Sequence, residues 1–520
     1  MKKYFFFLLL FPCLTIQAQD IQQALMASQT SLAGGARYTA MGGAFGAIGG
    51  DFNAMNINPA GSSIFSFSEA GFSGFSFSQN NETNYFGTNS KEKNREIGIH
   101  QAGIVLVLNN ENSPAWSKIA VGFNYQKTAN FNDRYVVQGN NASRGMDAYF
   151  LAFAQGYELR DIMWYDDETF GEAYRAVGNT SGLGYSGQQA LFGYAGYMIN
   201  GIPFEGSNDM TDPSIRSYTS NVLPGANGFN HRYESSMSGS QKRYTFNVSG
   251  VYQDKLYVGL NINSYSMEFS KITTLQERGY AQNSNLQFLD FYNELFSMGT
   301  GTSLQLGFIY KLDNAFRLGL TLDSPTYYRF SDRIYQNLYT EVYNTNNQID
   351  PVDLDPRIGG QVVETYLPEY EFDTPGGVRA SIAYIFKDRG LLSIDYSQRK
   401  FQNAQFAPKR DPYLNDLNQQ IAGNYSTRQL LQIGCEYRVN PQISLRAGYA
   451  HEKANQQGTD NSRGLLSGGI GYNFGASNVD VSIASVETNG AHRLFETGLT
   501  DSYRLEQNHF QLVISYRVKL

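Results

Sequence analysis

The residues of this chain that could do chemistry are few, and their spacing supports no reaction. Hydrolysis needs a nucleophile, a base and an orienting group brought together, and the sequence carries no such motif. The histidines lack the spacing of metal ligands, and we expect them to face solvent or a polar lumen: His100, His231, His451, His492 and His509. We therefore expect a protein that is not an enzyme and that holds no metal and no cofactor.

A glycine-rich segment near the N-terminus is the most distinctive local pattern. It reads GGARYTAMGGAFGAI over 34–48 and closes with NINPAG over 56–61. No strand is expected before it and no Gly-Lys-Ser/Thr follows it, so the segment is not a phosphate-binding loop. Glycine and alanine let one backbone approach another closely. This composition suits a compact segment enclosed in a narrow space.

Charged residues recur on one face of segments that alternate with period two. Leu318, Leu320 and Leu322, for example, alternate with Arg317 and Asp323. The same polar face collects Asp395, Glu436, Arg438, Arg446, Arg517 and Lys519. In a membrane barrel this face points into the lumen and the apolar face meets lipid. A half-buried sheet of a soluble protein gives the same local alternation.

The spacing of the connections between these segments favours the barrel. Tight links near 253–255, 313–314, 387–390, 440–441 and 475–477 alternate with long polar stretches near 270–300, 329–375, 402–427, 452–463 and 488–506. In an up-and-down sheet the alternate connections lie at opposite ends. Outer-membrane barrels have short periplasmic turns and long extracellular loops. A sandwich with Greek-key connections has no reason for this asymmetry.

The count of strands agrees with a closed barrel. We expect an all-β fold, a transmembrane antiparallel barrel of about 14 strands, over 69–79, 97–108, 117–138, 244–253, 256–269, 302–311, 315–328, 377–387, 391–401, 429–438, 442–451, 464–474, 478–487 and 507–520. The number is even, as it is in bacterial single-chain barrels. The third strand loses its alternation at Thr128-Ala129-Asn130. We expect a kink or bulge there.

The first 18 residues read as a secretory signal peptide. Lys2 and Lys3 precede an apolar run, and small residues precede Gln19. Cys13 follows a bulky Phe-Pro pair, which argues against a lipidation site, and Cys435 would then be the one cysteine left. The formal net charge of −7 argues against a nucleic-acid partner. Any entry into a membrane would be as strands, because no later stretch is apolar over about 18 residues.

The expected domains are a signal peptide (1–18), an N-terminal plug (19–65) and the barrel (66–520). The barrel would carry long loops at 139–243, 270–300 and 329–375. Two loop patches have apolar residues at helical spacing: Met146, Tyr149, Phe150 and Phe153 in one, and Phe288, Tyr292, Leu295 and Phe296 in the other. These residues either pack the loops against one another or form an external groove that captures a hydrophobic ligand.

The chain resembles the FadL/TodX (OMPP1) outer-membrane transporters, in the long form found in Bacteroidetes-type bacteria. The similarity begins with Gly-Ala-Arg…Ala-Met-Gly-Gly-Ala-Phe and Asn-Pro-Ala within 35–60. It continues in Gly299–Leu304, in Phe316–Leu320 with Ser324–Tyr328, in Gly390–Tyr396, and in Tyr437–Pro441 with Arg446–Tyr449. It spans nearly the whole chain after the signal peptide.

The resemblance implies a monomeric barrel in the outer membrane, surrounded by lipid, that takes up long-chain fatty acids or similar apolar molecules without an energy source. Its hatch residues would be Arg37, Met41, Gly42, Gly43, Phe45, Asn58, Pro59 and Ala60. A lateral exit would lie at the kinked third strand, at Thr128, Ala129, Asn130, Phe131 and Asn132. Barrels of a protein secretion apparatus begin similarly, so an assembly or shuttle barrel is the alternative function.

Overall fold

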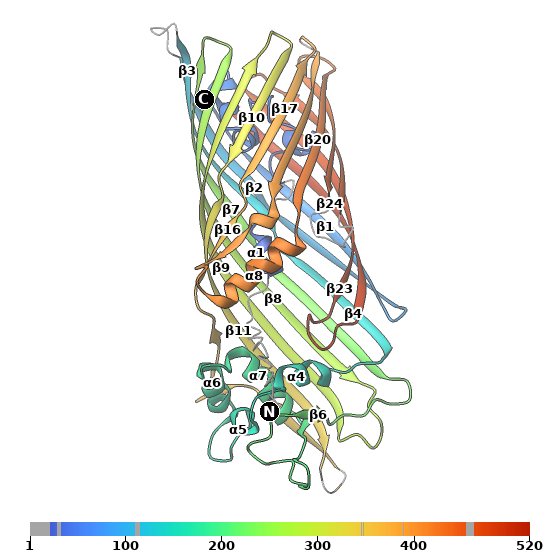
Figure 1. The fold of residues 1–520 in the computed structure, drawn as a ribbon. Helices are drawn as coiled ribbons and strands as arrows, with labels where there is room; N and C mark the ends of the chain where they lie inside the picture. Colours follow the sequence, from blue (N-terminus) through green and yellow to red (C-terminus); the bar gives the residue numbers. More distant parts are fainter. Residues whose placement is uncertain are drawn as a thin grey trace, which may run out of the picture.

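The computed structural model describes residues 21–28, 33–109, 115–344, 346, 348–387, 389–453 and 462–520. The expected signal peptide lies outside the described residues. The chain forms one large barrel with a helical region at one end (Figure 1).

The wall is a closed 14-stranded antiparallel barrel, as expected from the sequence. Closure is direct, because the first and last strands pair from Glu69↔Lys519 to Asn84↔Arg504. The wall strands are β1 (Glu69–Tyr85), β2 (Thr88–Asn109), β3 (Trp116–Asn130), β4 (Asp133–Ala142), β7 (Phe229–Tyr252), β8 (Leu256–Arg278), β9 (Leu286–Lys311), β10 (Phe316–Asp323), β11 (Thr326–Tyr343), β16 (Tyr370–Thr374), β17 (Gly377–Ile385), β18 (Gly390–Lys400), β20 (Thr427–Arg438), β21 (Ile443–Lys453), β22 (Arg463–Asn473), β23 (Ser477–Arg493) and β24 (Ser502–Lys519).

Three of the wall strands are interrupted, so that two segments act as one strand. β3 and β4 together form the third strand, and both pair with β7. β10 and β11 form the seventh and share β9 as a partner. β16 and β17 form the eighth, which follows the seventh around the barrel. The break expected in the third strand is therefore present.

The wall is apolar outside and polar inside. On β10, Leu318, Leu320 and Leu322 are each about 40% exposed, while Thr321 between them is buried. The same exposed apolar row continues on neighbouring strands, for example at Leu304 and Leu306 of β9. We call this outer apolar band the lipid belt. Apolar side chains that face lipid are not exposed to water, so their outward orientation costs no free energy. The barrel is therefore apolar outside and polar inside, the reverse of a soluble protein.

The two ends of the barrel differ sharply (Figure 1). Short turns and the C-terminus lie at one end. The other end carries the helices α4 (Asp147–Ala154), α5 (Leu159–Ile162), α6 (Phe170–Asn179) and α7 (Gly184–Ala195), and the short strands β5 (Ile199–Gly201), β6 (Tyr218–Ser220), β12 (Ile349–Leu354), β13 (Arg357–Ile358), β14 (Gln361–Val362) and β15 (Thr365–Tyr366). Between β18 and β20 lie η2 (Phe401–Asn403), β19 (Gln405–Ala407) and α8 (Pro412–Asn424). We call the two ends the short-turn end and the loop end.

Of the three expected long loops, the one at 270–300 is wrong, and the other two are present but shorter than expected. β8 and β9 fill most of 270–300, and β11 occupies the start of 329–375. In the region 139–243, β7 already begins at Phe229. Above the lipid belt the outer face no longer needs apolar residues. The alternation that marks a strand therefore disappears from the sequence although the strand continues.

The N-terminal segment, residues 33–65, lies within the short-turn half of the barrel (Figure 1). It contains α2 (Ala36–Ala40), α3 (Phe52–Ile57) and η1 (Pro59–Ile64). A further short helix, α1 (Ile21–Met26), lies beside α8 nearer the loop end. The N-terminal part of the chain therefore occupies the short-turn half of the lumen and reaches mid-height with α1.

Candidate functional site

The N-terminal segment is built from short helices with local caps. Asp51 begins α3, and its carboxylate accepts the amide of Asn53 at 2.9 Å. Asn58 begins η1 and accepts the amide of Ala60 at 3.1 Å, with Pro59 in the first turn. Such caps satisfy the free amides of a helix start. Very short helices that would not be stable alone are thereby defined.

The residues expected to form the hatch are almost all buried against the wall. The Gly42 amide donates to Ser467 Oγ at 3.2 Å, and its carbonyl accepts from Gln432 Nε2 at 2.9 Å. Gly42 has φ of 61°, and a side chain there would strike the backbone of Tyr449. Asn58 Nδ2 donates to the Phe308 carbonyl of β9 at 3.0 Å. The others with little or no exposure are Met41, Gly43, Phe45, Pro59 and Ala60.

Arg37 anchors the segment in a chain of buried charges. Its Nε donates to Glu436 at 2.8 Å, and Arg446 donates to the same carboxylate at 2.6 Å. Arg446 also reaches Asp480 at 2.7 Å, and Arg517 reaches Asp480 at 3.2 Å. The five side chains are at most 13% exposed. Removing one partner of such a pair leaves a buried charge and typically costs about 3–5 kcal/mol.

Lumen residues picked from the sequence hold the segment in part. Arg317 Nη1 donates to a segment carbonyl, that of Ile48, at 3.0 Å, and Asp395 accepts the Gly46 amide at 2.8 Å. Arg446 acts through Glu436, whereas Asp323 pairs within the wall. The contacts of the uncharged residues Gln432 and Ser467 with the segment were not predicted, because the sequence does not show which partner an inward polar side chain will have.

Glycines on the inner face of the wall admit the segment. A Cβ added at Gly259 or Gly307 would strike Pro59, and one at Gly434 would strike Met41. A Cβ at Gly319 would strike Gly46 in the same way. Glycine in a strand interior weakens the strand and often marks a close approach of another backbone. These inward glycines were a signal available in the sequence.

The break in the third strand leaves a gap in the backbone pairing of the wall. β3 pairs with β2 over Gln101–Asn109, while β1 pairs with the other edge of β2 over Thr88–Val105. β4 pairs with β7 on its other side. Within the described residues no backbone pairing joins β4 to β2. We call this stretch, between β2 before Gln101 on one side and residues 127–142 on the other, the wall gap.

Side chains close the wall gap. The Glu96 carboxylate of β2 accepts from Lys127 at 2.7 Å, from Asn130 at 2.6 Å and from Asn132 at 2.8 Å. Asp133 of β4 accepts in turn from side chains of β1, β2 and β24, among them Asn81 at 2.5 Å. Side-chain bonds replace the backbone ladder here, and they can be exchanged without unfolding a strand.

The kink also leads inward to a cluster of buried apolar side chains. Thr128 bonds to Gln241, Ala129 and Phe131 are buried, and Phe131 packs edge-on against Phe269 at 5.6 Å. The central apolar cluster, as we call it, comprises Ala24, Leu25, Ala27, Ala129, Phe131, Met267, Phe269, Tyr328, Phe330, Tyr370, Phe372, Phe401, Ala404, Phe406, Leu414, Leu417 and Ile421. It joins α1, α8 and the wall at mid-height of the barrel.

A family comparison gives this architecture its place. The family model "Outer membrane protein transport protein (OMPP1/FadL/TodX)" matches residues 226–518, more than half of the chain. The chain belongs to this family. A FadL homologue from Pseudomonas aeruginosa aligns over 94% of this chain and 99% of its own, with a TM-score of 0.55 and 11% identity. The toluene transporter TodX of P. putida aligns over the same shares, with a TM-score of 0.50 and 14% identity. No curated protein matches the sequence.

As a FadL/TodX-family barrel, the protein resides in the outer membrane, and its lipid belt faces the bilayer. At identities this low the similarity to the solved structures shows the fold alone. No helix among the described residues is long and apolar enough to cross a membrane. In the same part of the chain, no cluster of three or more His, Cys, Asp or Glu residues is arranged to hold a metal ion.

The first of the two apolar loop patches, around Tyr149, is helical, as expected, but it is not an open groove. Tyr149, Phe150 and Phe153 lie on α4, with Met146 at its start, and all four are at most 6% exposed. They pack into a core with neighbouring loops, and Tyr149 contacts Phe495 with ring centroids 4.8 Å apart. We call this core the loop core. The structure thus places these residues as the packing alternative described.

The helical spacing expected for the second patch is wrong. Phe288, Tyr292, Leu295 and Phe296 all lie on β9. Steps of four residues return to the same face of a strand as well as of a helix, so the pattern fits both. Leu295 packs towards the central apolar cluster. Phe288 and Phe296 are covered by the guanidinium groups of Arg278 and Arg333.

Two histidines are closely packed, and His100 faces the lumen as expected, with its Nδ1 3.2 Å from the Gly34 carbonyl of the N-terminal segment. His231 is 3% exposed and lies at 2.9 Å from Glu277 and 3.2 Å from the Tyr85 hydroxyl. His100 is buried and stacks on Phe75 with centroids 4.2 Å apart. Both pack inside the protein, where a polar ring needs partners that the sequence pattern does not reveal.

Proposed function

We propose that this protein is a passive transporter that moves a hydrophobic compound, such as a long-chain fatty acid, across the outer membrane. The observation that carries the proposal is the contact between the central apolar cluster and the wall gap at Phe131 and Ala129. An apolar ligand in that cluster would stand beside an opening towards lipid. Its transfer into the bilayer is favourable in itself and needs no energy source.

Capture would take place at the loop core. An apolar molecule crosses the polar surface of the outer membrane poorly, and buried aromatic side chains offer it a phase of lower free energy. Tyr149, Phe150 and Phe153 are buried in the structure, so we expect the loops to move apart before a ligand enters. Phe288 is buried under Arg278 and Phe296 lies under Arg333, so we do not assign ligand capture to this second patch.

The N-terminal segment would act as the hatch, over the expected span 19–65. α1 contributes Ala24 and Leu25 to the central apolar cluster, the next residue Ala27 adds to it, and Gln241 donates to the Ala27 carbonyl at 2.8 Å. A ligand of similar volume would displace α1. The buried charges around Arg37 hold the rest of the segment and keep the short-turn end closed.

The ligand would leave sideways through the wall gap. Glu96 holds the gap closed through bonds to Lys127, Asn130 and Asn132. These bonds lie between side chains, so the gap can widen while β2 keeps its ladder to β1 and β4 keeps its ladder to β7.

Mass spectrometry of small molecules released from the purified barrel tests the transport proposal. We expect the barrel, isolated in mild detergent, to retain a fatty acid or another apolar compound. A variant lacking residues 19–60 should retain less. Absence of any ligand together with a co-purifying secretion protein would contradict transport and favour an assembly or shuttle barrel.

A crosslink across the wall gap tests the lateral exit separately. The variant Asn94→Cys/Arg134→Cys spans the gap, because Asn94 Nδ2 donates to the Arg134 carbonyl at 3.1 Å. The exposed Cys435 is first changed to serine. A short bismaleimide should then block uptake. The matched control, Glu82→Cys/Lys91→Cys, joins strands that are already paired, and its uptake should not change. Equal uptake by both crosslinked proteins would rule out the lateral exit.

A further inference from the structure

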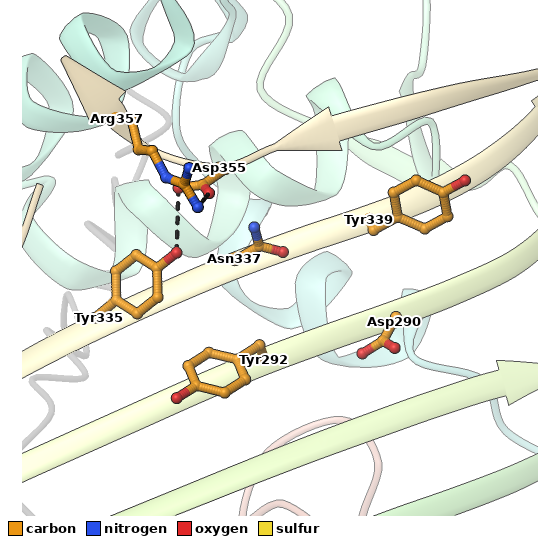
Figure 2. Close-up of a pocket in the computed structure, with 7 residues that line it drawn as sticks. All are labelled: Asp290, Tyr292, Tyr335, Asn337, Tyr339, Asp355 and Arg357. Atoms are coloured by element: carbon orange, nitrogen blue, oxygen red, sulfur yellow. Dashed lines mark hydrogen bonds and ion pairs between the residues drawn. The ribbon is translucent and has the colours of Figure 1, made fainter. Parts of the chain in front are cut away.

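A second recessed site lies outside the lumen, on the outer face of the wall near the loop end (Figure 2). The cavity has a volume of about 390 Å³. Its floor is formed by neighbouring residues of β9 and β11, which pair as Asn337↔Tyr292 and Tyr339↔Asp290. The inward residues of β11 between them, such as Gln336 and Leu338, are fully buried. The cavity therefore has no connection with the transport route.

One side of the cavity is a wall made by the segment after β12. The Tyr335 hydroxyl donates to Asp355 Oδ1 at 3.1 Å, and Arg357 pairs with Asp355 at 2.7 Å (Figure 2). The Tyr335 ring lies 5.7 Å from that of Tyr292. The aromatic rings are therefore held in place, with part of their surface open to solvent.

The lining of the cavity is aromatic and polar. It combines three tyrosines with the carboxylates of Asp290 and Asp355, an amide and one guanidinium, and it contains no aliphatic side chain. Such a surface does not suit a fatty acyl chain, which needs an apolar lining. A polyanion would meet two carboxylates, and the one cation is already paired. The Asp290 carboxylate is itself held by Gln276 at 2.8 Å.

Neutral sugars fit this combination of groups. A pyranose ring has apolar C–H faces that pack on aromatic rings, and hydroxyls at its rim that both donate and accept hydrogen bonds. Carboxylate, amide and guanidinium groups can each bind two neighbouring hydroxyls. A few placed polar groups on an aromatic surface are the usual means by which a pocket fixes the orientation of its ligand.

The position of the cavity also favours a sugar as its ligand. Tyr327 of β11 is 57% exposed in the lipid belt, and Tyr335 is eight residues further along the strand. At about 3.4 Å per residue, Tyr335 lies roughly 27 Å beyond Tyr327 along the tilted strand, towards the loop end. In an outer-membrane barrel the loop end faces the cell exterior. The cavity therefore lies where the saccharide chains of the outer leaflet surround the barrel.

We propose that the cavity between Tyr292, Tyr335, Tyr339 and Asp355 binds a neutral sugar residue of a glycan. Bound glycan would fix the barrel wall within the carbohydrate layer next to the ligand-capturing loops. The proposal is independent of the transport function, since none of these residues contacts the central apolar cluster or the wall gap.

Binding of glycans to the full-length barrel in detergent tests this site. The probes are an array of neutral hexose, deoxyhexose and N-acetylhexosamine oligosaccharides, and the delipidated polysaccharide of the source cell. We expect at least one neutral probe to bind saturably. Tyr335→Ala and Tyr339→Ala should weaken binding by ~tenfold or more, because each removes an aromatic face. Binding of the free oligosaccharides alone would assign a soluble glycan as the source, and binding of the polysaccharide alone would assign the membrane glycan.

The control is Tyr327→Ala, which removes an exposed tyrosine of the same strand from the lipid belt and should leave sugar binding unchanged. Tyr335→Phe keeps the ring and should retain most of the binding. Heat-dependent gel migration confirms that each variant is folded. The proposal is overturned if no neutral glycan binds, if Tyr335→Ala and Tyr327→Ala bind alike, or if acidic glycans alone bind in a salt-dependent way.

Discussion

At the scale of single residues, two carboxylates hold the parts of this barrel that transport would have to move. Glu436 binds both Arg37 of the N-terminal segment and Arg446 of the wall, and Glu96 binds three residues across the wall gap. A carboxylate accepts several hydrogen bonds at once. One residue can therefore close a contact that backbone pairing does not make.

Glu436→Gln should loosen the N-terminal segment without unfolding the wall. The substitution keeps the shape but leaves two arginines without their buried counter-charge, at a cost of up to about 3–5 kcal/mol. We expect faster hydrogen exchange over 36–46. Glu371→Gln is the control, because Glu371 forms an exposed pair with Arg329. Unchanged exchange over 36–46 in Glu436→Gln would show that Arg37 does not hold the segment.

Glu96→Gln should make the wall gap easier to open. It removes the ion pair with Lys127, and a hydrogen bond to a charged group contributes about 1.5–3 kcal/mol. We expect the uptake of a labelled fatty acid to rise by up to ~tenfold where exit limits the rate. Glu82→Gln removes a far more exposed carboxylate, paired with Lys91 near the tip of the same hairpin, and should have no effect. Uptake that is equal in the two variants would argue that Glu96 does not hold the exit.

At the scale of elements, the loop helix α6 depends on a local cap. Thr169 caps α6, and its backbone amide and hydroxyl donate to Glu172 at 2.8 Å each. These hydrogen bonds hold the pKa of Glu172 below its ordinary value of 4.5. A lowered carboxyl pKa gives stability that is present above pH 4.5 and is lost as the pH falls through the folded-state pKa.

Protection of α6 should therefore decrease as the pH is lowered from ~5 to ~3. Hydrogen exchange, corrected for intrinsic rates, measures it over 170–179. α7 has no side-chain cap and serves as an internal reference. Thr169→Ala should cost about 1 kcal/mol and reduce this pH dependence only in part, because the backbone amide of residue 169 still donates to Glu172. Parallel loss of protection in α6 and α7 would instead indicate a general loosening of the loops.

The sequence predicts the wall inside the membrane and fails above it. Leu318, Leu320 and Leu322 alternate with polar residues because one face meets lipid and the other the lumen. Near Tyr292 and Tyr335 the outer face is polar or aromatic and the inner face mixes apolar residues such as Leu338 with polar ones, so no regular alternation remains. Bonds such as Glu96–Asn132 join residues far apart in the chain and depend on how two strands separate. No local pattern encodes them.

The inward glycines allow a test of how tightly the segment fills the lumen. Gly307→Ala on β9 places a methyl group against Pro59 and Asn58 and should displace η1. We expect a higher conductance of the barrel in planar bilayers. Gly464→Ala on β22 is the matched control, since a Cβ there meets nothing within 4 Å. Equal conductance of the two variants would mean that the segment can adjust without opening the lumen.

At the scale of the whole molecule, two apolar regions are separated along the barrel. The loop core lies at the loop end, and the central apolar cluster lies at mid-height beside the wall gap. Both are filled by the protein's own side chains. A transport route through them therefore requires that loops and α1 move in turn, while the existing strand pairings of the wall stay intact.

Locking the loop core should stop capture at its first step. In a Cys435→Ser background, Tyr149→Cys/Phe495→Cys joins α4 to the loop between β23 and β24, where the native rings lie 4.8 Å apart. We expect oxidation to lower fatty-acid uptake by at least ~tenfold and a reductant to restore it, because the aromatic surface can no longer open. Each single-cysteine variant should respond to neither. Full uptake by the oxidised double variant would mean that ligand enters the lumen elsewhere, most directly beside α8, the other helix that joins the surface to the central apolar cluster.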